Sequence, residues 1–489
     1  MAERMGVFSS RWGMFLAMLG MAVGTGNIWR FPRVAATNGG GTFLVAWVVF
    51  LLLWSVPLIL VEFAMGKATR YGPIGAFARM MGKKYAWMGA WVAFTAIAIM
   101  FYYAVVAGWT IRYSLAALRA EIPGTEPGAL WASFAWSPSV VVYQGLALAV
   151  GVLVVARGVR GIEAATRILM PSLILLVLIL ALRAVTLPGA ERGLAFLFTP
   201  TWSDLADPNV WLQALTQNAW DTGAGWGLIL TYAIYLRAKE DTALNAFMLG
   251  VGNNLVSLIA GIMVLCTVFS IMPDAADQIV GAGNEGLTFI WVPQLFALMP
   301  AGRFFMILFF VALFFAAWSS LISMIELTTR VLEDAGVNRR TGIIVVGIVA
   351  FIAGIPSALD QGFFQNQDFV WGVALMVSGL FFAITVLRYG VTRFRETLIN
   401  SEHNNIHIGA WWDWVIRLVV IEALVLIVWW FWNVRTEPLW GPFGIGNMLV
   451  QFAVALVVFL LLNNWLVRRT NPDVDRVAPP EGEMVSSIP

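Results

Sequence analysis

The chain has 489 residues, of which 60% are hydrophobic and only 12% are charged, and its mean hydropathy is +0.81. A soluble domain carries about 25% charged residues, so the composition excludes a soluble globular protein. The net charge of +2 gives no indication of nucleic-acid binding, and the lone Cys266 excludes an intramolecular disulfide. Both histidines, His403 and His407, lie in a polar stretch between hydrophobic runs, which excludes histidine-ligated metals inside a membrane.

Twelve hydrophobic runs follow one another along the chain, and a bilayer-spanning helix needs about 20 such residues. The runs cover residues 13–34, 42–66, 86–117, 139–156, 163–185, 209–235, 242–271, 302–333, 341–357, 367–391, 411–433 and 446–468. Residues 273–300 are expected to form a long loop folded against the bundle. The first run ends in a charged segment without a small-residue cleavage site, so we expect no cleavable signal peptide.

Loops rich in Lys and Arg alternate with acidic or neutral loops along all twelve runs. Basic residues cluster within 67–84, 157–167, 237–239, 330–340, 388–395 and 468–469, whereas acidic residues lie within 121–126, 204–207 and 274–277 and at 360. By the positive-inside rule, the basic loops and both termini face the cytoplasm. We therefore expect a multi-pass protein of the inner or plasma membrane, with both termini cytoplasmic.

The first and sixth runs are interrupted near mid-membrane by glycines and polar residues, at 20–27 and 217–227. Glycine permits a helix to unwind there only where the freed backbone faces a cavity or a ligand. The two runs are five spans apart and therefore have opposite orientations, which is the pattern of an inverted-repeat transporter with a midplane site. Helix packing through Gly20-x-x-x-Gly24 is the alternative for the first run.

Residues 22–32 (AVGTGNIWRFP), followed by the glycines at 39–41 and by Phe43, resemble the first span of the neurotransmitter:sodium symporter family. The resemblance continues, in order, through Pro57, Glu62, Gly66, Tyr102, Tyr103, Trp109, Gly225, Gly227, residues 231–235 and residues 314–320. It implies an all-α integral membrane protein of 12 transmembrane helices. The fold would be a leucine-transporter-type inverted repeat with unwound spans 1 and 6.

The same resemblance divides the chain into five segments. Residues 1–12 would be a cytoplasmic N-terminus, 13–185 the first repeat (spans 1–5), 209–391 the inverted second repeat (spans 6–10), 411–468 spans 11–12, and 469–489 a disordered cytoplasmic tail.

Two sodium sites are implied by the resemblance. The second site would use carbonyls of Gly20, Val23 and Ala316 with hydroxyls of Ser319 and Ser320. The first site would use the Ala22 carbonyl and the side chains of Asn27 and Asn253, with Asp221 at the position where the family has Thr. Oxygen ligands of this kind suit a small hard cation. The alternative for the two serines is hydrogen bonding to their own helix.

Asp221 is the main departure from the family pattern. Ser257 alone would suggest chloride dependence, but Trp47 replaces the family's chloride-coordinating Tyr. A second anion beside a buried carboxylate is strongly disfavoured at low dielectric. We therefore expect Asp221 to supply a fixed negative charge, with one or two sodium ions and no chloride as co-substrates. Two alternatives remain, an N-cap for a half-helix starting at Thr222 and direct binding of a cationic substrate group.

A substrate pocket is also implied. The amides of Thr25 and Gly26 and the Tyr103 hydroxyl would meet a carboxylate, and carbonyls of Ala22, Trp220 and Asp221 would meet an amine. Gly24, rather than Asp, favours amino-acid-like substrates. The side-chain pocket would be lined by Ile99, Tyr103, Trp220, Gly223, Trp226, Ser320 and Met324, with Gly223 freeing volume. The alternative is a cage of Trp220, Trp226, Tyr103 and Asp221 around a betaine-like methylated ammonium.

The residues with which the family closes its site on the outer and cytoplasmic sides, its gates, are partly present here. The resemblance pairs Arg30 with Asp368 on the outer side and matches Tyr235 and Asp334 to the cytoplasmic latch. The latch's amino-terminal partners are Met5 and Phe8 here, with Arg4 or Arg11 as candidate substitutes. Glu62 and Glu326 are assigned structural roles in polar networks.

The resulting prediction is sodium-coupled symport of a small zwitterionic solute, a neutral amino acid in the first instance, by alternating access. Its partners would be the substrate and the lipid bilayer, with no nucleic acid and no implied oligomer. The spans contain no metal-ligand set, Ser/His/Asp arrangement or cofactor motif, so no enzyme is expected. An ion channel is the alternative from another class.

Overall fold

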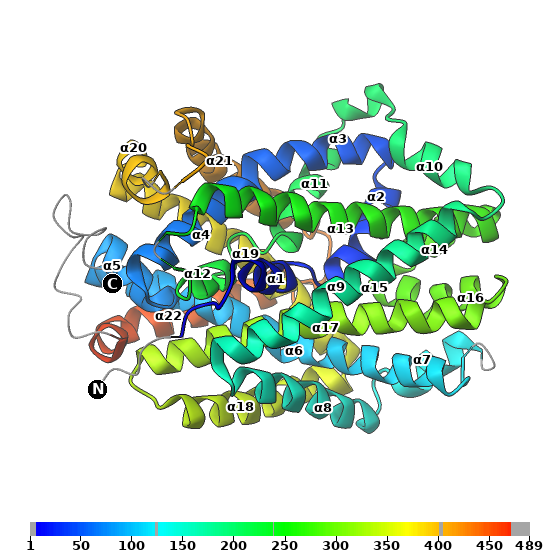
Figure 1. Cartoon of the computed structure of the whole chain (residues 1–489), viewed down its shortest axis with the longest axis horizontal. Coiled ribbons are helices and arrows are strands. Elements are labelled where there is room, and N and C mark those ends of the chain that lie inside the picture. Colours follow the sequence, from blue (N-terminus) through cyan, green and yellow to red (C-terminus); the bar gives the residue numbers. More distant parts are fainter. Residues whose placement is uncertain (1–5, 123–125, 238, 401–403, 471–489) are drawn as a thin grey trace.

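The computed structural model describes residues 6–122, 126–237, 239–400 and 404–470, and the secondary structure assigned within these ranges is helical. Ten helices among them are long and apolar enough to cross a membrane (Figure 1). They are Gly41–Thr69 (α3, Gly41–Phe50; η2, Leu51–Ser55; α4, Val56–Thr69), Lys83–Leu118 (η3, Lys83–Tyr85; α6, Ala86–Leu118), Pro138–Val155 (α8), Gly158–Val185 (α9), Thr242–Ile271 (α13), Gly302–Asp334 (α17), Arg339–Leu359 (α18), Gln361–Tyr389 (α19), Trp411–Asn433 (α21) and Ile445–Thr470 (α22). Each coincides with one predicted span.

The two spans missing from that set are the two predicted to be broken. Span 1 consists of α1 (Arg11–Ala22), η1 (Gly26–Arg30) and α2 (Phe31–Thr37), with an extended residue after α1. Span 6 consists of α11 (Pro208–Asp221) and α12 (Leu228–Ala233), separated by residues 222–227. Three glycines in that gap, Gly223, Gly225 and Gly227, have φ of +72°, +89° and +77°. Residues that carry a side chain rarely adopt these positive values.

Asp221 is the last residue of α11, and the chain that follows it is not helical. The predicted alternative of Asp221 as an N-cap at Thr222 is therefore wrong. Two of the half-helices, α1 and α11, are capped at their starts, where Ser10 accepts from the Gly13 N–H and Asp207 accepts from the Asn209 N–H.

Residues 273–300, expected to be a loop, are mostly helical instead. They form η5 (Pro273–Ala275), α14 (Ala276–Gly281), α15 (Gly283–Glu285), η6 (Gly286–Trp291) and α16 (Val292–Ala297). The segment is held by buried aromatic contacts: Phe289 is fully buried, and its ring stacks on that of Trp131 with 4.9 Å between the centroids. The other short helices are α5 (Pro73–Met81), α7 (Pro127–Phe134), α10 (Ala190–Phe198), η4 (Trp202–Ala206), α20 (Val391–Phe394) and η7 (Arg395–Ile399).

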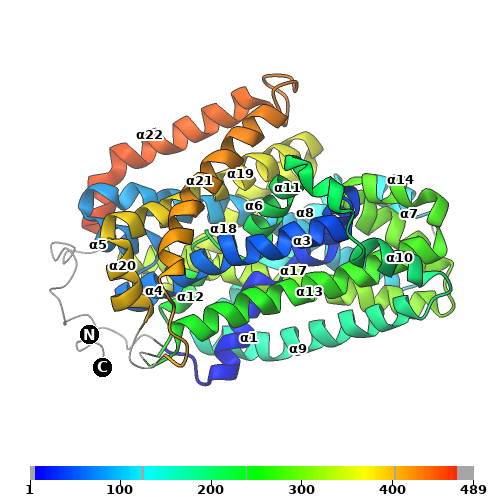
Figure 2. The same ribbon diagram turned by 90° about the horizontal axis from the view of Figure 1, so that it is seen from above.

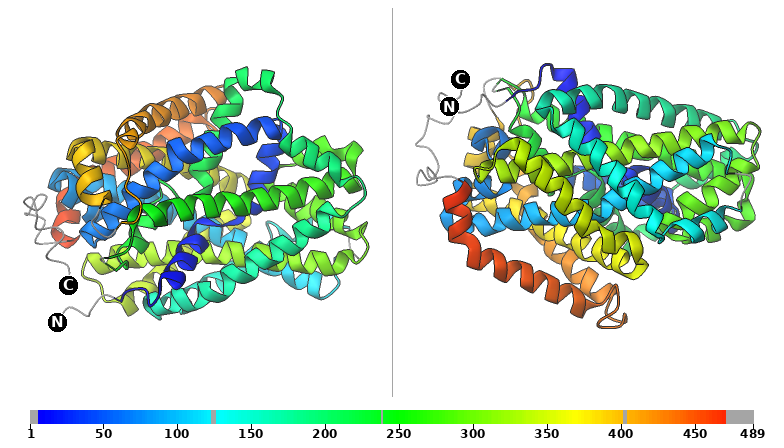
Figure 3. Two further views of the ribbon diagram at one scale, coloured as in Figure 1. Left: turned by 45° about the horizontal axis from the view of Figure 1, so that its top comes forward. Right: turned by 90° about the horizontal axis from the view of Figure 1, so that it is seen from below.

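Span 1 runs through the centre of the bundle, where α1 packs against α9, α13 and α17 (Figures 1 and 3). The helices α21 and α22 lie to one side (Figure 2). We call the end of the bundle that holds Phe8, Tyr235 and Thr470 the terminal end, and the end that holds α14 and α7 the far end. Both unwound stretches thus lie deep inside the protein, shielded from lipid, where freed backbone groups are tolerated.

Candidate functional site

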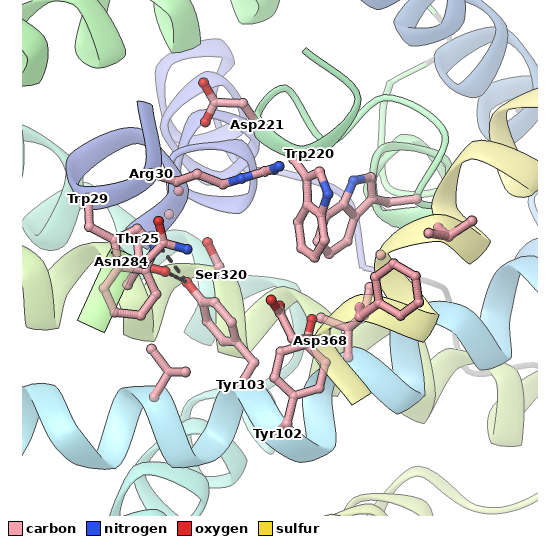
Figure 4. A pocket seen from close by; sticks show the side chains of 18 of the residues that line it. Thr25, Trp29, Arg30, Tyr102, Tyr103, Trp220, Asp221, Asn284, Ser320 and Asp368 are labelled. Atoms are coloured by element: carbon pink, nitrogen blue, oxygen red, sulfur yellow. Dashed lines mark hydrogen bonds between the residues drawn. The ribbon is translucent and has the colours of Figure 1, made fainter. Parts of the chain in front are cut away.

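A cavity of about 420 Å³ lies where the two broken spans meet (Figure 4). Its lining includes all the residues predicted to bind substrate, namely Ala22, Gly24, Thr25, Gly26, Ile99, Tyr103, Trp220, Asp221, Gly223, Trp226, Ser320 and Met324. It extends to residues that the sequence did not single out, among them Gly372, Phe369 and Glu437. Such a volume is typical of small-molecule sites.

The break in span 1 faces Tyr103. The backbone N–H and the hydroxyl of Thr25 each lie 3.2 Å from the Tyr103 hydroxyl, in donor geometry. A Cβ atom on Gly24 would lie 2.8 Å from Ser320 Oγ and 3.1 Å from the Tyr103 hydroxyl, so a side chain at position 24 would displace these two hydroxyls. Backbone N–H groups and one hydroxyl therefore line this part of the cavity, and these are the donors that an anionic group needs.

Buried polar side chains surround the position of the predicted first sodium site. Asn27 Nδ2 donates to Asn253 Oδ1 at 2.9 Å and to Ser257 Oγ at 2.8 Å, and Ser257 donates to Asp221 Oδ2 at 2.8 Å. Asp221 is 2% exposed and its Oδ1 forms no hydrogen bond, although the Gln217 side chain and the Arg30 guanidinium both interact with the carboxylate. That oxygen faces span 1, because a Cβ on Gly26 would lie 3.5 Å from it. A buried carboxylate oxygen without a partner, next to amide oxygens, suits a hard cation.

Four of the five residues predicted for the second sodium site, Val23, Ala316, Ser319 and Ser320, come together from distant parts of the sequence. Ser319 Oγ lies 3.0 Å from the Ala316 carbonyl and 3.5 Å from that of Val23, and Ser320 Oγ lies 3.4 Å from the Val23 carbonyl. Gly20, the fifth predicted residue, lies in α1 three residues before Val23, and a Cβ on it would lie 3.1 Å from Met170 Sδ. Ser319 bonds partly to its own helix, as the alternative expected, while both serines also reach span 1.

Glu62, in α4, supports the unwound part of span 6. Its Oε1 accepts from the Gly225 N–H at 2.7 Å and its Oε2 from the Leu230 N–H at 3.0 Å, and the side chain is fully buried. The carboxylate thus satisfies backbone donors that the missing helical turn leaves free.

Comparison with known proteins agrees with this geometry. The model of the sodium:neurotransmitter symporter family matches residues 5–139 and 136–470. The chain belongs to the sodium:neurotransmitter symporter family. It is 30% identical over 444 residues to an uncharacterized sodium-dependent transporter of Bacillus subtilis, covering 86% of this chain and 96% of that protein. A relative from Methanocaldococcus jannaschii is 30% identical over 448 residues, with 86% and 89% covered.

Among solved structures, the chain resembles MhsT in complex with L-phenylalanine, with a TM-score of 0.77 and 29% identity over 86% of this chain and 99% of that one. The protein is therefore a multi-pass membrane protein of the leucine-transporter fold, and its family performs sodium-coupled symport. The predicted family and fold class are confirmed.

Two tryptophans and an arginine cover the symporter's cavity. The Trp220 and Trp226 rings meet edge to face at 6.0 Å, and the Arg30 guanidinium lies over the Trp220 ring at 4.9 Å (Figure 4). Trp220 also fits closely against Gly372, where a Cβ would lie 2.2 Å from Trp220 Cζ2. The space expected beside Gly223 is taken by Met21, because a Cβ on Gly223 would lie 3.2 Å from Met21 Sδ.

The symporter is open at its far end. Arg30 and Asp368 face the same cavity, but among the described residues they form no ion pair, and Arg30 stacks on Trp220 instead. The cavity continues from them to Glu437 and to Glu285 of α15 at the rim. Burial there raises the pKa of the Glu285 carboxyl.

At the terminal end the symporter is closed by aromatic packing. Phe8 is 3% exposed, lies edge to face with Tyr232 and Tyr235, and donates its N–H to the Tyr235 carbonyl at 3.2 Å. The Tyr235 hydroxyl donates to Glu326, which also pairs with Arg339 at 2.6 Å.

Asp334, expected in the latch, pairs with Arg330 of its own helix at 2.6 Å and accepts from the Gly72 N–H at 2.6 Å. Arg11, one candidate partner, is exposed at the start of α1. The other candidate, Arg4, and also Met5 lie outside the described residues. The structure thus does not bring Asp334 together with a described basic residue from the N-terminal segment.

The N-terminal segment is held instead by Glu163, which the sequence did not single out. Glu163, at the start of α9, accepts from the Ser9 N–H at 2.8 Å and from the Ser9 hydroxyl at 2.7 Å. Arg167 bridges Glu163 and Ser10 at 2.7 and 2.8 Å, and Arg237 donates to the Ser9 carbonyl at 2.6 Å. We call these contacts the Ser9 clamp. The signal that the sequence offered for Glu163 was an acid at the first position of a predicted span.

Proposed function

We propose that the symporter couples the uptake of a neutral amino acid to sodium by alternating access. The observation that carries the proposal is the Thr25 N–H beside the Tyr103 hydroxyl at the break in span 1. Together they offer hydrogen-bond donors to a carboxylate, while position 24 is glycine and carries no acid that would hold a free amine. The similarity to MhsT, which was solved in complex with L-phenylalanine, supports the same substrate class.

Sodium, as the driving co-substrate, would be held at two places. Ala22, Asn27, Asp221 and Asn253 would contribute oxygens at the first site, and Gly20, Val23, Ala316, Ser319 and Ser320 at the second. The support is the unpaired Asp221 Oδ1 and the convergence of two hydroxyls on span-1 carbonyls. Asp221 would fix negative charge where Ser257 and Asn27 already converge, so transport would not need chloride.

The terminal end would face the cytoplasm of the cell, as the basic loops predict. In this orientation the structure corresponds to an outward-open state. Closure would bring Arg30 from the Trp220 ring to Asp368, and inward opening would release Phe8 and the Ser9 clamp. The predicted segments 13–185 and 209–391 would act as the two repeats, with 1–12 and 469–489 as cytoplasmic ends.

A betaine-like solute is the second candidate, favoured by the paired Trp220 and Trp226 rings. Its weakness is that the Trp220 face already carries the Arg30 guanidinium, which would repel a second cation. An aromatic cage works through the free face of its rings.

The test is uptake into proteoliposomes with sodium, potassium or choline outside, using neutral L-amino acids and glycine betaine as substrates. We expect saturable, sodium-stimulated uptake of an apolar amino acid, unchanged when gluconate replaces chloride. Tyr103→Phe, which keeps the ring and loses the hydroxyl, should weaken amino-acid binding by about tenfold or more, as a hydrogen bond to a charged group does. Preference for betaine would establish the second candidate, and substrate-independent current would indicate a channel.

A further inference from the structure

Three buried acidic side chains of the spans, Glu62, Asp221 and Glu326, have partners inside the protein, and the carboxyl of Glu422 in span 11 differs from them. Glu62 accepts from two backbone N–H groups, Asp221 from Ser257, and Glu326 pairs with Arg339. Glu422, at the midpoint of α21, is 8% exposed, and its buried Oε2 has no hydrogen-bond partner among the described residues. An ionisable residue inside a membrane indicates a functional site by default.

Glu422 borders a second cavity, of about 450 Å³, which we call the span-11 crevice. Its walls include Phe50 of α3, Trp211, Leu212 and Leu215 of α11, and Ile421 and Val425 of α21. The last two are 57% and 50% exposed, so the crevice opens toward the bilayer, and it shares no lining residue with the central cavity.

The walls of the span-11 crevice are apolar and their own polar groups are satisfied. The Trp211 indole N–H donates to the Leu205 carbonyl at 2.9 Å, and its ring meets Phe50 edge to face at 6.0 Å. The Glu422 carboxyl is therefore the polar side-chain group of the lining that is left without a partner. Hydrocarbon cannot supply one, because lipid tails neither donate nor accept hydrogen bonds.

The chemistry of the carboxyl restricts the occupant. A neutral carboxyl group both donates and accepts, and a hydroxyl group does the same without bringing a charge into the bilayer. Beside a neutral carboxyl, an ammonium group would bring an unpaired charge into the bilayer, and its desolvation opposes binding. The apolar walls and the opening toward lipid favour a molecule that is dissolved in the membrane.

We propose that the span-11 crevice is a binding site for an apolar alcohol from the bilayer, whose hydroxyl bonds to Glu422 and whose hydrocarbon body lies along α11. Because α11 is the far half of broken span 6 and ends at Asp221, an occupant would contact an element of the transport site from the lipid side. The site is independent of the substrate proposed above.

Photolabelling of the full chain in lipid vesicles tests the proposal. The probe is a diazirine-bearing alkanol of about ten carbons, and its matched controls are the same diazirine on an alkane and on an alkylamine. Labelling is counted by mass spectrometry on residues 205–215, away from Glu422 itself, because photoproducts favour carboxylates. We expect labelling by the alkanol that excess unlabelled decanol removes and that exceeds labelling by the alkane about fivefold to tenfold, the worth of one hydrogen bond.

Three variants sharpen the result. Glu422→Leu should reduce labelling to the level of the alkane, Glu422→Gln should retain it, and Leu212→Trp, which fills the crevice and leaves the carboxyl intact, should abolish it. Sodium-dependent substrate binding serves as the folding control for each. Equal labelling by alkane and alkanol, labelling unaffected by Glu422→Leu, or preference for the alkylamine would each overturn the proposal.

Discussion

The charge of Asp221 should set the affinity for sodium, and Asp221→Asn tests this without changing the size of the side chain. The carboxylate is 2% exposed, so solvent screens it weakly, and its Oδ1 forms no hydrogen bond, so a cation there would compete with the Gln217 side chain and the Arg30 charge. Two unit charges about 4 Å apart attract by about 4 kcal/mol at an effective dielectric constant of about 20. That energy corresponds to about a thousandfold in affinity.

The cost of keeping the carboxylate ionised in the sodium-free protein offsets part of this gain. We therefore expect Asp221→Asn to raise the sodium concentration for half-maximal substrate binding by between about tenfold and a thousandfold. The assay is a titration of purified protein with sodium at constant ionic strength, read by binding of labelled substrate.

The matched control is Asp207→Asn, the same substitution at the exposed opposite end of α11, where asparagine still caps the helix. In this control, the sodium concentration for half-maximal substrate binding should stay within about twofold of the wild-type value, since exposed charges are screened. An Asp221→Asn protein that folds and keeps the wild-type sodium dependence would refute the assigned role. So would wild-type uptake that falls when gluconate replaces chloride.

Three other perturbations follow from the contacts. Gly372→Ala should displace Trp220, and the Arg30 guanidinium would then lose the ring on which it stacks in the open state. We expect the population of the open state to fall by up to about tenfold. The measurement is the labelling rate of a cysteine introduced at the cavity rim in a Cys266→Ala background, and an unchanged rate would contradict this. Glu62→Gln should destabilise the protein by about 1–3 kcal/mol in thermal unfolding, because one backbone donor loses its acceptor; wild-type stability would exclude the role. Ser9→Ala should speed deuterium exchange in residues 8–22 by about tenfold, whereas equal exchange would show that the clamp contributes nothing.

Much of the transport site could be anticipated from sequence because its signals are local. The residues predicted to bind substrate line one cavity, and both broken spans are where the glycines placed them. Partners in the gates could not be predicted, because they depend on how whole helices approach each other. Asp334 turns to Arg330 one helical turn away, while Glu163 and Ser9, far apart in sequence, meet at the terminal end.

Hydropathy, charge alternation and glycine content are properties of short stretches, so the sequence by itself determined the twelve spans, the two breaks and the family. Tertiary structure alone decided which groups meet across helices. It put Met21 into the space that Gly223 leaves, Trp220 between Arg30 and Gly372, and Ser257 against Asp221. It also left Glu422 facing an apolar crevice without a partner, because whether a buried carboxyl is satisfied depends on the surfaces of neighbouring helices, which no single segment encodes.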